Sequence, residues 1–239
     1  MDLPLQPIYL FADSQLLFWK LNGRLFLDSI RERTPSPTPK AAYIGASNGD
    51  DPQFYSIFEA AMEGIGIRDC RMILSSFPST DESFVNDADI ILLAGGDVER
   101  GWKVFKQVGL SDLIIKRYFE GAILIGVSAG AVQLGLYGLA EQEKSPNTLF
   151  DTFKLAPFIV GAHEDEQEWQ NLKEMVEMLD SVTKAIGIPA GGGLIYYPDQ
   201  SIEAIRRPLH EFSMQEGLIN SSLLLPKQEQ YSGFQADEE

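Results

Sequence analysis

The chain has 239 residues, of which 44% are hydrophobic, and its formal net charge is −16. This length and apolar content are typical of one globular domain with a sizeable core. The negative charge argues against nucleic acid or a membrane surface as a partner, because both require a basic protein surface. The single Cys70 excludes an intrachain disulfide framework, and no run of ~20 apolar residues is present. We expect no signal peptide, because the first residues show no positive region followed by an apolar core. We therefore expect a cytoplasmic protein.

Apolar runs and helical patterns alternate through the first half of the chain. The alternation predicts a doubly wound, mostly parallel α/β sheet with helices on both faces. Gly-rich turns follow three of the strands, at the carboxyl edge where such sheets bind ligands. The predicted strands cover residues 8–11, 41–44, 71–74, 88–94 and 122–125, and the predicted helices start at residue 52 or cover residues 98–107 and 111–119.

The second half of the chain has a different pattern. A strand over residues 158–160 precedes a predicted helix over residues 164–180. Short apolar runs between turns then predict an antiparallel C-terminal extension from residue 184 onward. We expect residues 1–226 to form a single α/β domain and residues 227–239 to be a disordered acidic tail, because the tail has little to bury.

The sequence G-V-S-A-G at residues 126–130 matches the nucleophile elbow of hydrolases. Such a turn raises its central side chain, here Ser128, above the sheet edge, and it aims the N–H of Ala129 at the group attacked. A second N–H donor for a developing oxyanion could come from Gly96 or Asp97 in the Gly-Gly-Asp turn that ends the preceding strand. These residues predict acyl-transfer chemistry.

A serine nucleophile needs a base, and the chain has two histidines. His163 follows a predicted strand and is expected at the same sheet edge as Ser128, which favours it as the base. An alternative is an α/β-hydrolase-type esterase, in which Asp180 or Asp199 and then His210 follow the serine in the chain.

Two histidines 47 residues apart and one cysteine give no metal-ligand spacing. The glycines at 191–193 are not followed by the Lys-Ser/Thr of a phosphate loop. We therefore expect neither a metal nor a cofactor.

Residues 90–97, 121–131, 155–163 and 185–189 together carry a family resemblance. Most of residues 40–205 resembles the dipeptidase E and cyanophycinase family of serine peptidases, which shares a Gly-Gly-Asn/Asp turn and a Gly-x-Ser-Ala-Gly-Ala elbow. The resemblance implies a flavodoxin-like sheet related to class I glutamine amidotransferases. It also implies Ser128 as nucleophile, His163 as base, and Gly96 with Ala129 as oxyanion hole.

The chain departs from this family after the histidine. Family members usually have an aromatic residue and then an arginine there, whereas this chain reads His-Glu-Asp-Glu-Gln-Glu over residues 163–168. These carboxylates would disfavour an acidic substrate and favour a cationic one, although they would also stabilise a helix N-terminus. Asp97 and Glu164 are the candidates for contacting the substrate.

A second departure concerns the carboxylate that orients the histidine. Many relatives have an acidic residue where this chain has Ala190, so the candidates are Glu143, which lies 15 residues after Ser128, and Glu141. The leading hypothesis is a serine hydrolase that cleaves a small peptide or isopeptide, with a homodimer kept as a candidate assembly. The alternative is a catalytically weakened or silent binding protein on the same fold.

Overall fold

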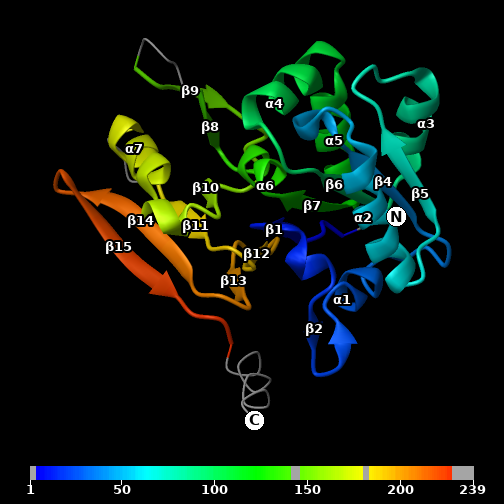
Figure 1. The fold of residues 1–239 in the computed structure, drawn as a ribbon, viewed down its shortest axis with the longest axis horizontal. Helices are drawn as coiled ribbons and strands as arrows, with labels where there is room; N and C mark the ends of the chain where they lie inside the picture. Colours follow the sequence, from blue (N-terminus) through cyan, green and yellow to red (C-terminus); the bar gives the residue numbers. More distant parts are fainter. Residues whose placement is uncertain (1–3, 141–145, 180–182, 228–239) are drawn as a thin grey trace.

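The computed structural model describes residues 4–140, 146–179 and 183–227 (Figure 1). A seven-stranded sheet forms its centre, and strands β1, β7, β6, β4 and β5 of this sheet run parallel. The C-terminal strands β12 and β13 complete one edge, where β12 is antiparallel to both of its neighbours. The predicted mostly parallel α/β sheet is thereby confirmed. In spatial order the strands are β13 (Ile202–Ile205), β12 (Gly193–Tyr196), β1 (Ile8–Phe11), β7 (Ile123–Val127), β6 (Ile90–Leu93), β4 (Lys40–Ile44) and β5 (Asp69–Ile73).

The central strands separate two apolar cores. Successive side chains of a strand point to opposite faces, so Leu10 belongs to one core and the neighbouring Phe11 to the other. The Leu10 face is covered by α3 (Ser79–Asp87), α4 (Val98–Gln107), α5 (Leu110–Phe119) and α6 (Ala129–Leu134). The Phe11 face is covered by the 3₁₀ helix η1 (Ser14–Leu17), α1 (Asp28–Arg31) and α2 (Pro52–Gly64). The predicted helices on both faces are confirmed.

A second sheet of four strands lies beside the first, with the order β10 (Ile159–Ala162), β11 (Ala185–Ile188), β14 (Leu209–Gln215) and β15 (Leu218–Leu224) (Figure 1). Helix α7 (Gln170–Leu179) packs its apolar residues on this sheet. The β14–β15 hairpin has no clear signature in the sequence, because β15 is mostly exposed and includes Asn220, Ser221 and Ser222. An alternation of apolar and polar residues is therefore missing there.

The prediction of one helix over residues 164–180 is wrong. Residues Asp165–Gln167 form the 3₁₀ helix η3, Glu168 and Trp169 then have φ values of 51° and 63°, and α7 begins only at Gln170. The break turns the buried Trp169 ring onto β11, where a Cβ atom on Gly187 would come within 2.5 Å of it. Burial of this ring therefore determines where the helix begins.

Four short strands and one short helix complete the description. The paired strands are β2 (Lys20–Leu21) with β3 (Arg24–Leu25), and β8 (Tyr137–Ala140) with β9 (Thr148–Asp151). The 3₁₀ helix η2 (Ala46–Asn48) follows β4. Within the described ranges, no helix has the length and apolar character needed to cross a membrane. The predicted tail covers residues 227–239, and all of it except Lys227 lies outside the described residues.

Candidate active site

The elbow at Ser128 is a strained turn between β7 and α6. Ser128 has φ 51° and ψ −112°, and its N–H donates a hydrogen bond of 2.9 Å to the carbonyl of Phe11 on β1. A non-glycine residue at positive φ is costly and is held there only by the surrounding structure. The flanking glycines make that structure compact: a Cβ atom on Gly126 would overlap the backbone of Gly130, and one on Gly130 would overlap the carbonyl of Leu93.

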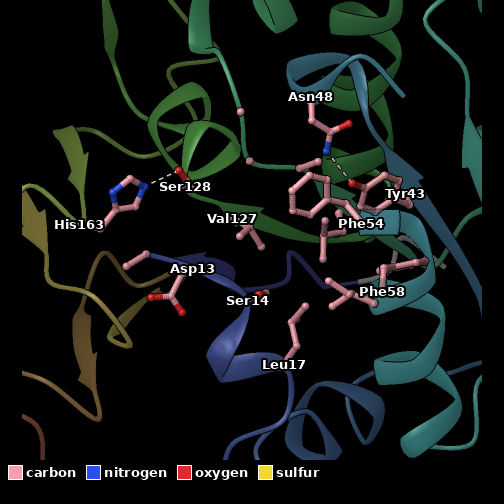
Figure 2. Close-up of a pocket in the computed structure, with 16 residues that line it drawn as sticks. Asp13, Ser14, Leu17, Tyr43, Asn48, Phe54, Phe58, Val127, Ser128 and His163 are labelled. Carbon is pink, nitrogen blue, oxygen red and sulfur yellow. Dashed lines mark hydrogen bonds between the residues drawn. The ribbon is translucent and has the colours of Figure 1, made fainter. Parts of the chain in front are cut away.

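The structure brings His163 to this serine. The histidine follows β10 and has φ 48°. Its backbone N–H donates a 2.9 Å hydrogen bond to the carbonyl of Ile188 on β11. The imidazole Nε2 lies 2.7 Å from Ser128 Oγ (Figure 2). His210 instead lies on β14, where its ring centre is 5.2 Å from that of Trp169. A serine paired with His163, rather than with His210, is thus the arrangement in the structure.

The position of His210 leads to a prediction about stability. Burial lowers the pKa of His210, Asp165 opposes this effect, and Lys173 adds to it. Because the unfolded chain binds this proton more readily than the folded one, stability should fall as the pH drops below the ordinary histidine pKa of about 6.5. We expect the melting temperature to fall less between pH 7.5 and 5.5 in His210→Gln than in the wild type, as measured by circular dichroism. Equal falls would contradict this role.

The Gly-Gly-Asp turn lies against η2. The N–H of Asp97 donates a 2.9 Å hydrogen bond to the carbonyl of Ser47, so it is not available to an oxyanion. The Asp97 carboxylate accepts a 2.7 Å hydrogen bond from the N–H of Arg100 and caps α4. Gly96 has φ 132°, and a Cβ atom there would overlap the Ser47 carbonyl. Gly96 and Asp97 are the two predicted oxyanion donors in this turn, and Gly96 is therefore the one that remains a candidate.

The predicted oxyanion donor on the elbow side is the N–H of Ala129. It is the first residue of α6, and the first N–H groups of a helix have no partner within that helix. The Ala129 N–H is therefore set at the start of a helix whose dipole also favours negative charge.

A buried polar contact that the sequence did not indicate links the Ser128 elbow to the Gly-Gly-Asp turn. Gln133 on α6 is 0% exposed, and its Nε2 donates to Ser47 Oγ at 3.1 Å and to the carbonyl of Val98 at 2.9 Å. The Arg100 side chain also donates to the Ser47 carbonyl, from Nε at 3.1 Å. These bonds connect the elbow helix to the Gly-Gly-Asp turn. A single glutamine in a short helix carries no sequence signal for this role.

A cavity of about 260 Å³ opens beside Ser128 and His163 on the α2 face of the sheet (Figure 2). One of its residues, Asp13, caps η1 and accepts hydrogen bonds from the N–H of Gln15 at 2.8 Å and of Gly191 at 2.6 Å. Asp97 and Glu164, the predicted substrate contacts, do not line this cavity.

The carboxylate that would orient His163 is not among the described contacts. Within the described part of the chain, no carboxylate is hydrogen-bonded to the His163 ring, and the predicted Glu141 and Glu143 lie outside the described residues. Asp165, two residues after the histidine, accepts a 3.2 Å hydrogen bond from the N–H of Ala190. Its carboxylate therefore joins η3 to the turn that follows β11.

Comparison with known proteins places the chain in a family. The family model described as Peptidase family S51 matches residues 21–205. The chain belongs to peptidase family S51. Membership confirms the resemblance to the dipeptidase E and cyanophycinase family and assigns the chain to the serine-type peptidases.

Individual relatives of this S51 chain are distant. It is 26% identical over 95 residues to the uncharacterized peptidase YgaJ of Bacillus subtilis (strain 168), a match that spans 39% of this chain and 41% of that protein. The crystal structure of a peptidase from an acI-B1 Actinobacterium superposes with a TM-score of 0.72 at 17% identity, covering 95% of this chain and 97% of the other. That of a putative peptidase E protein from Listeria monocytogenes EGD-e gives 0.58 at 16% identity, covering 93% and 100%. These two structures share the fold.

Proposed function

We propose that this S51 protein hydrolyses a small peptide or isopeptide through an acyl-enzyme on Ser128. The observation that carries the proposal is the 2.7 Å contact between Ser128 Oγ and His163 Nε2 at the strained elbow. A serine hydroxyl is a weak nucleophile until a base within hydrogen-bond reach accepts its proton. His163 is at that distance.

In this mechanism His163 Nε2 takes the proton as Ser128 Oγ attacks the substrate carbonyl carbon. The negative charge that develops on the carbonyl oxygen is stabilised by the N–H groups of Gly96 and Ala129. The tetrahedral intermediate collapses, the amine leaves with the proton from His163, and an ester to Ser128 remains. A water oxygen then attacks the ester carbonyl carbon while His163 accepts the water proton. The bond between the acyl carbon and Ser128 Oγ breaks, the carboxylic acid leaves, and the proton returns from His163 to Ser128 Oγ.

The experiment that tests this proposal is covalent labelling. A fluorophosphonate probe is expected to label the wild-type protein at Ser128 and to leave Ser128→Ala unlabelled, as read by mass spectrometry of the intact protein and its peptides. The probe reports an activated serine and requires no knowledge of the substrate. Labelling of Ser128→Ala at another residue would contradict the assignment of the nucleophile.

A second candidate function is a silent binding protein on the same fold. The observation that favours it is the lack, among the described residues, of a carboxylate bonded to the His163 ring, since an unoriented histidine loses much of its efficiency. A folded wild-type protein that takes up no probe would support this second function.

A further inference from the structure

The cavity beside Ser128 is lined mainly by apolar side chains from four different elements. Leu17 comes from η1, Phe58 from α2, Leu92 from β6 and Val127 from β7, and all four also belong to the apolar core on the α2 face. The cavity is thus an open continuation of that core at the carboxyl edge of the sheet. We refer to it as the side-chain pocket.

Helix α2 contributes two unusual residues to this pocket. Phe54 and Ile57 lie one turn before the core residues Phe58 and Ala61, but they are 51% and 36% exposed. The first turns of α2 come after β4 and the short 3₁₀ helix η2 and so stand at the carboxyl edge of the sheet, where the apolar stripe of the helix extends beyond the core. Large apolar side chains exposed around a cavity mark a binding site.

The charges around the pocket select against an acidic group. Within the described part of the chain, no lysine or arginine lines the pocket. Burial of a charged group without an opposite charge is costly, so a substrate carboxylate would be poorly held there.

The pocket also offers little to a cationic group. The carboxylate of Asp13 is already bonded to two backbone N–H groups, and Figure 2 shows it at the other end of the pocket from Phe54. The Tyr43 hydroxyl accepts a 2.8 Å hydrogen bond from Asn48, and burial raises the pKa of Tyr43 to about 12, so this end is neutral. The three acidic residues that follow His163 do not line the pocket, and the cationic preference expected from them has no support there.

The direction of the pocket identifies which part of a substrate enters it. The leaving amine must receive its proton from His163 and therefore lies on the His163 side of the serine. Leu17, Phe54 and Phe58 lie on the other side of Ser128 (Figure 2). The pocket is therefore placed for the residue whose carbonyl group is attacked.

We propose that the side-chain pocket binds an uncharged apolar side chain, of the leucine or phenylalanine type, on the acyl side of the bond to be cleaved. This inference rests on the hydrolase function proposed above. The volume of about 260 Å³ is smaller than the roughly 300–1,000 Å³ of sites for drug-sized ligands, so it accommodates one side chain rather than an extended peptide.

The test uses α-aminoalkyl diphenyl phosphonates, which react with an activated serine and carry the acyl-side side chain of choice. Leucyl, phenylalanyl, aspartyl and lysyl versions would compete with the fluorophosphonate for Ser128, and their rates of inactivation would be compared. We expect the leucyl or phenylalanyl compound to react at least about 10-fold faster than either charged one, the scale on which apolar pockets discriminate. A faster aspartyl or lysyl compound would overturn this inference and leave the hydrolase function standing.

A matched pair of variants locates the effect. Phe54→Lys places a cation at the pocket, and Phe119→Lys makes the same change on α5 at a phenylalanine that is 64% exposed and does not line the pocket. We expect Phe54→Lys to lower the leucyl-to-aspartyl rate ratio by about 10-fold or more and Phe119→Lys to keep the wild-type ratio. An unchanged ratio in a folded Phe54→Lys would also overturn the inference. If the wild type reacts with no fluorophosphonate, the hydrolase function fails, and this inference fails with it.

Discussion

His163→Gln is expected to slow fluorophosphonate labelling of Ser128 by about 1,000-fold, within the range that a positioned base supplies. Glutamine cannot accept the serine proton in the attack, although it is similar in length to histidine. The Nε2 atom of His163 lies 2.7 Å from Ser128 Oγ, so this substitution removes the one base that the structure brings to the nucleophile within the described residues. The measurement is the second-order rate constant of labelling, taken from the time course of intact mass.

His210→Gln is the matched control for this prediction. Its imidazole packs on Trp169 in the second sheet and does not line the cavity, so we expect its labelling rate to remain close to the wild-type rate. Circular dichroism would show that both variants are folded at the temperature of the assay. A large loss of rate in His210→Gln together with a normal rate in His163→Gln would reverse the assignment of the base and favour the esterase order of residues.

Much of the central sheet follows from local sequence. Strands β4, β6 and β7 are short, mainly apolar runs that end at glycine-containing turns, and this combination is typical of parallel strands buried on both faces. The pair of Ser128 and His163 could also be predicted, because a serine elbow and a strand-terminal histidine limit the arrangements at one sheet edge. The residue that orients the histidine could not be predicted, because its position depends on loop conformation. The candidates Glu141 and Glu143 lie outside the described residues.

Other parts of the site depend on contacts between segments distant in the chain. Ser47 and Gln133 are 86 residues apart, and their hydrogen bond has no local pattern that would reveal it. The helical spacing of Phe54, Ile57, Phe58 and Ala61 puts these residues on one apolar face of α2, but this periodicity does not show where the sheet beneath the helix ends. Phe54 and Ile57 therefore line the pocket without belonging to the core, Phe58 belongs to both, and Ala61 packs in the core alone. The sequence after His163 predicts a helix that starts at residue 164, but the chain turns at the buried Trp169 and α7 begins only at Gln170.

Gly96→Ala is expected to slow labelling of Ser128 by about 100- to 1,000-fold, the effect of losing one oxyanion donor. Gly96 has φ 132° and lies against the Ser47 carbonyl, which also accepts hydrogen bonds from Asp97 and Arg100. A methyl group at this position has no space, so the backbone of the turn must rotate or shift and move the Gly96 N–H away from the nucleophile. The phosphonyl oxygen of the probe needs the same donors as a substrate carbonyl, and the labelling rate therefore measures the loss.

Gly109→Ala separates this effect from backbone strain. Gly109 also has a positive φ, 73°, but a Cβ atom there would meet nothing within 4 Å, and it precedes α5 rather than lining the site. Both variants should lose stability by about 1 kcal/mol or more, because alanine is strained at positive φ. Only Gly96→Ala should lose labelling rate when both are assayed below their melting temperatures. A Gly96→Ala protein that is destabilised but labelled at the wild-type rate would exclude Gly96 from the oxyanion hole and leave the Ala129 N–H as its remaining candidate donor.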